Sequence, residues 1–284
     1  MPTPSFKLAS VEGLRARLLK FFSQPALTVA SLIDAMRVLA KYRAHLIQWE
    51  MAKRYGGTIQ GGPFAGMEYV DHGSEGAHVP KMLGCYEHEL HRYIEAAIAT
   101  DYQTVVNIGC AEGYYALGLA RRMPNARVHA FDIDPTGRKI CAEVATRNGV
   151  AGRVTVAERF TPEMFADYAG QKAFVMMDIE GAELELLGGA PKSSLAGLDF
   201  IIECHDKPDA GISAKLARLI EETHLTATVG HGMRPVDLPP FLKEVGHLDQ
   251  LLAVWEWREF PTPWLVAASR DRTGTPFWKA VSNG

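Results

Sequence analysis

Acidic side chains and a histidine follow two short apolar runs of the sequence, a position where catalytic groups are often found. Asp178 follows the run 173–177, and Glu203 and His205 follow the run 200–202. If the two runs are neighbouring parallel strands, the side chains after them meet at the carboxyl edge of one sheet. The residues expected to converge on one cleft are Asp178, Glu203, His205 and Asp206.

Two kinds of chemistry are open to Asp178, Glu203 and His205, to which we assign the catalytic roles. In the first, the three side chains bind a divalent metal that orients a substrate hydroxyl and lowers its pKa. In the second, His205 is a metal-free general base, oriented by an acid and titrating near roughly 6–7. The incomplete set of oxygen ligands favours the base. Glu183 and Glu185 are interpreted only as acids that complement the dipole at a helix start.

A glycine turn follows the apolar run 104–108. Gly109 and Gly113 allow the chain to turn sharply and approach a ligand before a helix begins. The spacing is GxxxG and not the GxGxxG of dinucleotide-binding folds, which opposes an NAD-dependent oxidoreductase. Asp132 lies about 20 residues beyond the turn, where an acid accepts hydrogen bonds from ribose hydroxyls. Asp134 is expected to cap the next helix.

From residue 102 onward, apolar runs alternate with stretches of helical periodicity. Strands are expected at 104–108, 127–131, 154–157, 173–177, 200–202, 227–230 and 264–268, and helices at 114–122, 138–148, 182–187 and 214–222. This alternation predicts an α/β fold with a mostly parallel sheet and helices on both faces.

The preceding part of the chain has a different pattern. Residues 11–55 are expected to be helical with a break at Pro25, residues 56–76 to form a short β-hairpin cap, and residues 86–100 to form one helix. We therefore predict an N-terminal helical region over residues 1–100 and a catalytic domain over residues 101–284.

The glycine turn with its downstream acid resembles a known family. Gly109-x-x-x-Gly113 followed by Asp132 looks like motif I and the acidic loop of class I S-adenosylmethionine-dependent methyltransferases. Asn107 stands where that motif usually has an acid, and Ala111 stands where it has its middle glycine.

A second block strengthens the resemblance and narrows it. The segment 177–187, which reads Met-Asp-Ile-Glu-Gly-Ala-Glu-Leu-Glu-Leu-Leu, resembles the Asp-Val-Glu-Gly-Ala-Glu block of FkbM-type methyltransferases. The resemblance covers residues 102–269. It implies a Rossmann-like class I methyltransferase fold with a seven-stranded sheet and a reversed last strand.

The resemblance implies S-adenosyl-L-methionine as the cofactor and a small-molecule acceptor methylated on oxygen. The residues expected to bind the cofactor are Asn107, Gly109, Cys110, Ala111, Gly113, Asp132, Ile133, Glu158, Phe160 and Asp178. A protein or nucleic-acid methyltransferase is the alternative; the chain lacks an Asn-Pro-Pro-Tyr block, which counts against methylation of base amino groups. A non-catalytic S-adenosylmethionine-binding module is opposed by the acids at the strand ends.

Composition and charge exclude other classes. The 284 residues carry 30 basic and 33 acidic side chains, a net charge of −3, so no basic excess suggests nucleic-acid binding. No apolar run is long enough to span a membrane, and charged residues interrupt the N-terminus, so we expect neither a span nor a signal peptide. Four cysteines without a CxxC pair favour a cytoplasmic protein. The apolar stripes of the N-terminal helices need a partner, and we predict a homodimer.

Overall fold

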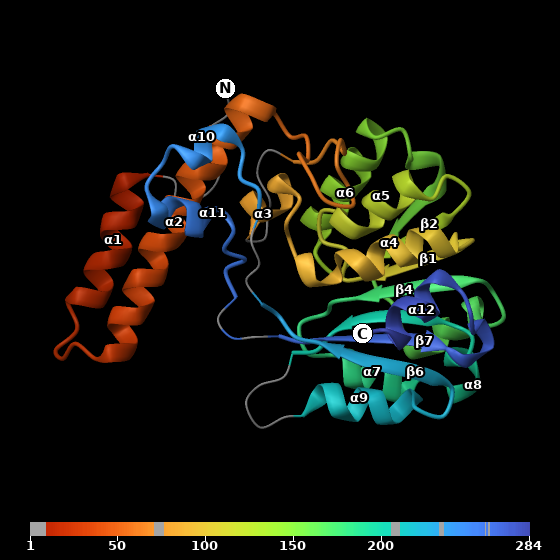
Figure 1. Cartoon of the computed structure of the whole chain (residues 1–284). Coiled ribbons are helices and arrows are strands. Elements are labelled where there is room, and N and C mark those ends of the chain that lie inside the picture. The colour runs from red at the N-terminus through yellow and green to blue at the C-terminus, as the bar shows by residue number, and fades with distance from the viewer. Residues whose placement is uncertain (1–9, 71–76, 206–210, 233–235, 259, 261) are drawn as a thin grey trace.

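The computed structural model of this chain describes residues 10–70, 77–205, 211–232, 236–258, 260 and 262–284, with one seven-stranded sheet at its centre (Figure 1). The strands are β1 Thr104–Ile108, β2 Arg127–Phe131, β3 Val154–Ala157, β4 Ala173–Met177, β5 Asp199–Glu203, β6 His224–Val229 and β7 Trp264–Ser269. Their order is β3-β2-β1-β4-β5-β7-β6, and β7 runs antiparallel to both of its neighbours. This is the Rossmann-like class I methyltransferase fold, and the predicted fold class is confirmed.

Helices cover both faces of the sheet, as the alternating pattern predicts. The first face carries α4 His91–Thr100, α5 Tyr114–Arg122, α6 Pro135–Arg147 and α12 Pro276–Ser282. The second face carries η3 Pro162–Tyr168, α7 Glu183–Gly189, α8 Lys192–Leu195 and α9 Ile212–Ile220. Short 3₁₀ turns are η1 His88–Leu90, η2 Ala151–Arg153 and η4 Arg270–Arg272.

Two apolar cores result from the alternation of side chains along the strands. Phe174 and Met176 of β4 point into the core under α4, α5 and α12, whereas Val175 and Met177 point into the core under α7 and α9. Because β1 and β4 are buried on both faces, β4 is a continuous apolar run, and β1 is apolar except for the buried Thr104 and Asn107. The carboxyl ends of β1, β2, β4 and β5 therefore share one edge of a rigid sheet.

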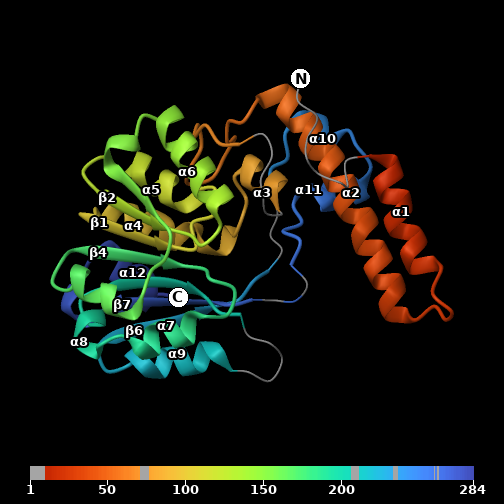
Figure 2. The same cartoon turned by 180° about the vertical axis from the view of Figure 1, so that it is seen from behind.

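The N-terminal helices stand to one side of the sheet (Figures 1 and 2). α1 Val11–Phe22 and α2 Val29–Tyr55 form a hairpin broken around Pro25, as predicted. α3 His78–Leu83, α10 Pro240–Lys243 and α11 His247–Ala253 lie between the hairpin and the sheet. An ion pair of 2.6 Å joins Arg43 of α2 to Asp249 of α11. None of the described helices is both long and apolar enough to cross a bilayer.

Two local predictions for the N-terminal part are wrong. The expected helix 86–100 is interrupted because Glu87 adopts a left-handed conformation with φ 48°, so α4 begins only at His91. The expected hairpin at 56–76 is reduced, in its described part, to a single antiparallel bridge between Thr58 and Glu68. Residues 71–76 lie outside the described residues. No element was predicted for residues 78–83, where the structure forms α3.

Candidate active site

The glycine turn after β1 forms because two loops touch at the sheet edge. Gly109 has φ +80°, and a Cβ added there would lie 1.6 Å from the carbonyl oxygen of Asp178. Any side chain at position 109 would thus push the β1 and β4 loops apart. Gly113, with φ +92°, begins α5, and its added Cβ would lie 2.7 Å from Cys141 Sγ of α6. Gly113 is therefore required because α5 and α6 pack closely, whereas the sequence had indicated that it lets a ligand approach the backbone.

Asp132, at the end of β2, joins the glycine turn to the next loop. Its carboxylate accepts hydrogen bonds from the Ala111 and Asp134 amides, both at 2.7 Å. Asp134 accepts the Thr136 and Gly137 amides at 3.0 Å and caps α6, which confirms its predicted structural role. The side chain of Asp132 remains beside the cleft, where carboxylate lone pairs can accept ribose hydroxyls.

A cleft of about 760 Å³ opens along the carboxyl edge of the sheet. The residues predicted to bind the cofactor that line it are Asn107, Gly109, Cys110, Ala111, Asp132, Ile133, Glu158, Phe160 and Asp178. Gly113 alone of the predicted set does not line it. Phe160 packs edge-on against Phe131 with 5.0 Å between ring centroids, whereas Glu158 is largely exposed. Residues that the sequence did not indicate also line the cleft, namely Tyr69, Lys81, Tyr86, Tyr114 and Tyr115.

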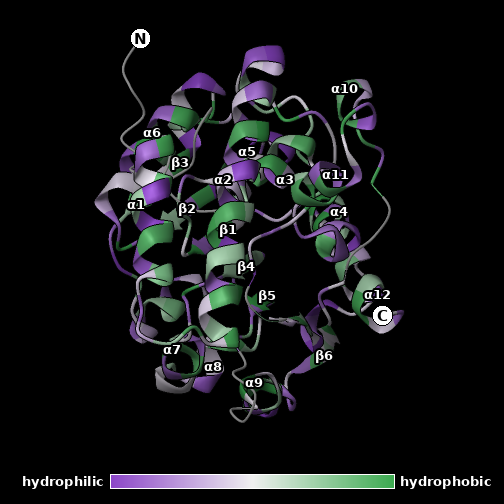
Figure 3. Cartoon of the chain, turned by 90° about the vertical axis from the view of Figure 1, so that its left-hand side faces the viewer, coloured by the Kyte–Doolittle hydropathy of each residue, from purple (hydrophilic) through white to green (hydrophobic). Residues whose placement is uncertain are grey.

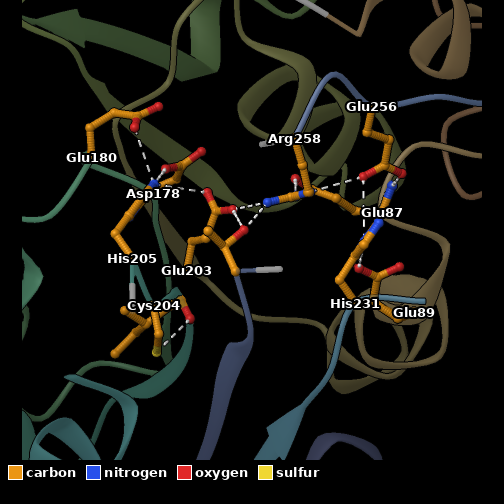
Figure 4. Close-up of polar contacts among 12 residues, drawn as sticks. Glu87, Glu89, Asp178, Glu180, Glu203, Cys204, His205, His231, Glu256 and Arg258 are labelled. Atoms are coloured by element: carbon orange, nitrogen blue, oxygen red, sulfur yellow. Dashed lines mark hydrogen bonds and ion pairs between the residues drawn. The ribbon is translucent and has the colours of Figure 1, made fainter. Parts of the chain in front are cut away.

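The predicted cluster at the ends of β4 and β5 is brought together (Figure 4). One ligand atom each of Asp178, Glu203 and His205 lies within 4.8 Å of the other two. His205 Nε2 is 3.2 Å from Glu180 Oε2, 3.6 Å from Glu203 Oε2 and 3.7 Å from Asp178 Oδ1. Asp206 lies outside the described residues.

Glu183 does more than begin a helix, contrary to expectation. It is fully buried, and its Oε1 lies 2.9 Å from His205 Nδ1. The same oxygen accepts the amides of Ile179 and Gly181. Glu183 therefore fixes the orientation of the imidazole and leaves Nε2 facing the other acids.

The charges of the cluster determine where its protons reside. Burial raises the pKa of Asp178, and the charge of Glu203 raises it further. Burial alone would raise the pKa of Glu203, but a hydrogen bond from Asp178 and the charge of Arg258 lower it overall. The two side chains therefore share one proton, held on Asp178.

His205 is held in its cationic form. Burial alone would lower the pKa of His205, but hydrogen bonds to Glu180 and Glu183 and the charges of Glu203 and Asp178 raise it to about 10. The expected pKa near 6–7 is therefore wrong, because the sequence did not show how many carboxylates surround the ring. At neutral pH this imidazolium is not a free base.

A second polar cluster adjoins the first through Arg258 (Figure 4). Arg258 contacts Glu203 and Thr262, and it lies 2.7 Å from Glu87 and 3.2 Å from Glu256. Arg258 lies in the irregular segment after α11, which has no pattern that indicates function.

Two further acids of this second cluster have partners of their own. Tyr115 donates its hydroxyl to Glu87. Burial raises the pKa of Glu87 to about 8, with Arg258 opposing the rise and the charge of Glu203 adding to it. His231 Nδ1 lies 3.0 Å from Glu89 and 3.7 Å from Glu256. His231, which the sequence left undecided, therefore belongs to this cluster.

The donor set of the first cluster fits a divalent cation. Asp178 Oδ1 is buried and has no hydrogen-bond partner among the described residues. A histidine whose Nδ1 is held by a carboxylate, with Nε2 directed at two further carboxylates, is a common arrangement around bound metals. The nearby Arg258 guanidinium disfavours a bound cation, because it already neutralises Glu203.

Comparisons with known proteins give distant likenesses. No family model matches the chain. A release factor glutamine methyltransferase of Moorella thermoacetica is 40% identical over 55 residues, and the match spans only 19% of each protein.

Among solved structures, the O-methyltransferase TomG from Streptomyces achromogenes is 15% identical, with 80% of this chain and 89% of that chain covered and a TM-score of 0.44. Precorrin-6y C5,15-methyltransferase from Geobacter metallireducens is 16% identical, with 63% and 88% covered and a TM-score of 0.42. Because these values are low, we base the fold assignment on the strand order and draw no activity from the likenesses.

Proposed function

We propose that this protein is an S-adenosylmethionine-dependent methyltransferase that methylates an oxygen atom of a small molecule, and that it is FkbM-like. One observation carries the proposal: the glycine turn, Asp132 and Asp178 line one cleft at the carboxyl edge of a sheet with the class I strand order. The cleft has a volume of about 760 Å³, which lies within the range of small-molecule binding sites. The acids and His205 at the strand ends favour an enzyme over a binding module.

The chain contributes positioning and proton handling to this reaction. When bound, S-adenosylmethionine supplies a methyl group on a sulfonium, and the cleft holds it close to the acceptor oxygen. We assign the ribose to Asp132 and the adenine to the surface around Phe160. The acceptor proton passes to a carboxylate of the strand-end cluster, since His205 already carries its own protons. A divalent cation held by Asp178, Glu203 and His205 would lower the pKa of the acceptor hydroxyl.

Asp132→Ala tests the cofactor site. It should weaken S-adenosylmethionine binding by about 1.5–3 kcal/mol, because a charged hydrogen-bond acceptor is lost at the ribose. Calorimetry on the folded variant measures the effect, and Asp132→Asn should lose less because one acceptor oxygen remains.

Asp134→Ala is the matched control, since both of its carboxylate oxygens are engaged in the cap of α6. It should lower the free energy of unfolding by about 0.5–2 kcal/mol and leave cofactor affinity unchanged. Unchanged affinity in a folded Asp132→Ala variant would remove Asp132 from the site.

The hairpin of α1 and α2 presents apolar side chains to solvent, and we propose that a second copy of the chain covers them. No residue of α1 is buried. The exposed apolar side chains of the hairpin are Val11, Leu19, Phe22, Leu27, Val29, Leu32, Ile33, Met36, Leu39, Leu46 and Trp49. Figure 3 views this side, with hydrophobic turns along both helices. At roughly 80 Å² apiece they offer about 900 Å², close to the ~800 Å² per partner of a stable interface.

The spacing of the exposed residues on α2 fits helix-to-helix packing. Val29, Leu32, Met36, Leu39 and Leu46 occupy alternating three- and four-residue steps, apart from one gap, as in a coiled-coil seam. Two such hairpins related by a two-fold axis would close into a four-helix bundle.

Light scattering at micromolar concentration should therefore give twice the 31.2 kDa chain mass. Met36→Glu should give a monomer, because it places a charge in the seam, whereas Ala142→Glu on the exposed side of α6 should not. A wild-type monomer would contradict the dimer. If that monomer also bound phosphatidylserine vesicles, the hairpin would be a membrane-binding surface instead.

Two further predictions stay open to test. We propose a cytoplasmic location, which the four buried cysteines support, since none of them is in a disulfide. We also propose that residues 1–100 form a region separate from the catalytic domain 101–284, although α4 of the former packs on α12 of the latter.

A further inference from the structure

A buried lysine lines the cleft, and it has no charged partner among the residues that the structure describes. Lys81 lies on α3 and is 7% exposed. Its Nζ lies 4.9 Å from the ring centroid of Tyr86 and 5.9 Å from that of Tyr114, and both rings also line the cleft. Within the described part of the chain, no carboxylate pairs with this ammonium group.

An ammonium group in this position needs a counter-charge. Burying a charge is costly unless it is paired, and contact with aromatic faces offsets only part of that cost. The other buried cation of the site, Arg258, has three carboxylates around it. Lys81 differs because the contacts of its ammonium group within the described residues are with aromatic rings, and its side chain lines the cleft. A ligand in the cleft can therefore complete its surroundings.

A second feature directs positive charge at the same place. Tyr114, whose ring lies under the Lys81 ammonium, is the first residue of the nine-residue helix α5. The free amides and the dipole of a helix start attract anions. Because α5 follows β1, while Glu158 follows β3 two strands away, Lys81 lies apart from the proposed adenine surface.

We propose that Lys81 and the first turn of α5 form a carboxylate-binding subsite of the cleft. The proposal rests on the proposed function and adds a recognition element to it. The carboxylate has two potential sources, namely the amino-acid part of the cofactor and an acidic acceptor molecule. In both cases, the lysine pairs with a charge that enters only with the ligand.

Calorimetry with two nucleosides tests the first source. S-Adenosylhomocysteine carries the amino-acid carboxylate, whereas 5′-methylthioadenosine shares the adenosine and the sulfur but lacks it. Lys81→Met keeps the length and the packing on the tyrosines and removes the charge. It should raise the Kd for S-adenosylhomocysteine by about 10- to 100-fold and leave the Kd for 5′-methylthioadenosine unchanged. Lys81→Arg should retain most of the affinity, and Lys279→Met, exposed on α12, should bind both as wild type.

A second pair of probes tests the acceptor as the source. 4-Hydroxybenzoate and 4-hydroxybenzyl alcohol are titrated into the protein, free and loaded with S-adenosylhomocysteine. If Lys81→Met keeps its nucleoside affinity but binds the benzoate at least tenfold more weakly, with no change for the alcohol, the acceptor supplies the carboxylate.

One result would contradict the carboxylate-binding subsite, and a different result would contradict the proposed function. Wild type that binds both nucleosides, with Lys81→Met unaffected in every titration, would overturn the subsite alone. Wild type that binds neither nucleoside would contradict the proposed function. The titrations of the free protein would then overturn the subsite if wild type and Lys81→Met bound the benzoate alike.

Discussion

Replacing His205 with alanine should lower the rate of methyl transfer by about 10²–10⁴-fold, the scale of lost proton-transfer assistance, with cofactor affinity little changed. The imidazolium lies within 3.7 Å of four acidic side chains. Its removal leaves Glu180, Glu183 and Asp178 without this cation, whereas Glu203 keeps Arg258. They would then take up protons, and the group that accepts the acceptor proton would be lost. If the cluster binds a metal, the same substitution removes a ligand. Single-turnover rates measured beside calorimetry separate the two effects.

The pH dependence and a chelator distinguish the mechanisms. With the pKa of His205 at about 10, the wild-type rate should show no inflection of this imidazole near roughly pH 6–7. A metal scheme predicts loss of activity in EDTA and recovery with Mg²⁺, whereas the metal-free scheme predicts no response. Exposed His247→Ala is the matched control and should behave as wild type. A folded His205→Ala enzyme with the full rate would place the chemistry elsewhere.

The same pKa makes a prediction about stability. Because the folded-state pKa of His205 is raised above the unfolded value of about 6.5, its contribution to the free energy of unfolding is full below pH ~6.5. The contribution declines as the pH rises towards 10. We therefore expect the difference in the free energy of unfolding between wild type and His205→Ala to shrink as the pH rises from about 6.5 towards 10. Urea unfolding at a series of pH values measures this difference.

The strands and the loops that line one side of the cleft could be predicted because local sequence determines them. The five residues of β4 are buried on both faces, so this strand appears as an uninterrupted apolar segment that ends before Asp178. Asp134 is recognisable because a cap bonds amides two and three residues away. The meeting of Asp178 with Glu203 followed from topology alone, since adjacent parallel strands end at one edge.

The rest depends on contacts between distant segments that have no local pattern. Arg258 reaches Glu87 across 171 residues and Glu203 across 55. Glu87 does not differ in sequence from an ordinary surface glutamate, and nothing local to Glu203 indicates that an arginine pairs with it. Lys81 lies on a six-residue helix without a side-chain cap, and Glu87 has a backbone conformation unfavourable for its residue type. The pKa of His205 was missed for the same reason, since Glu183 was assigned only to the start of a helix.

Arg258→Met should lower the free energy of unfolding by about 3–5 kcal/mol, the cost of leaving buried charges without their partner. Glu87 and Glu203 are 1% and 4% exposed, and this guanidinium contacts both. Urea unfolding at pH 7 measures the loss. Arg43→Met is the matched control, because the ion pair of Arg43 with Asp249 is mostly exposed on the arginine side and should contribute no more than about 1 kcal/mol.

The deficit of Arg258→Met should shrink as the pH falls, and this dependence separates lost charge pairing from lost packing. Without the guanidinium, the effect of burial on Glu203 is opposed less, so its folded-state pKa, which Arg258 helps to hold below the usual value, rises. The pKa of Glu87, already about 8 in wild type because of burial, rises further. Protonation then removes the unpaired charges, and the variant regains stability relative to wild type as the pH falls towards 5. Adding Glu203→Gln to Arg258→Met should restore part of the loss at pH 7 for the same reason, since Glu203 is the contacted acid whose pKa lies below its usual value. An Arg258→Met variant no less stable than Arg43→Met, or one whose deficit is constant with pH, would show that Arg258 does not neutralise this cluster.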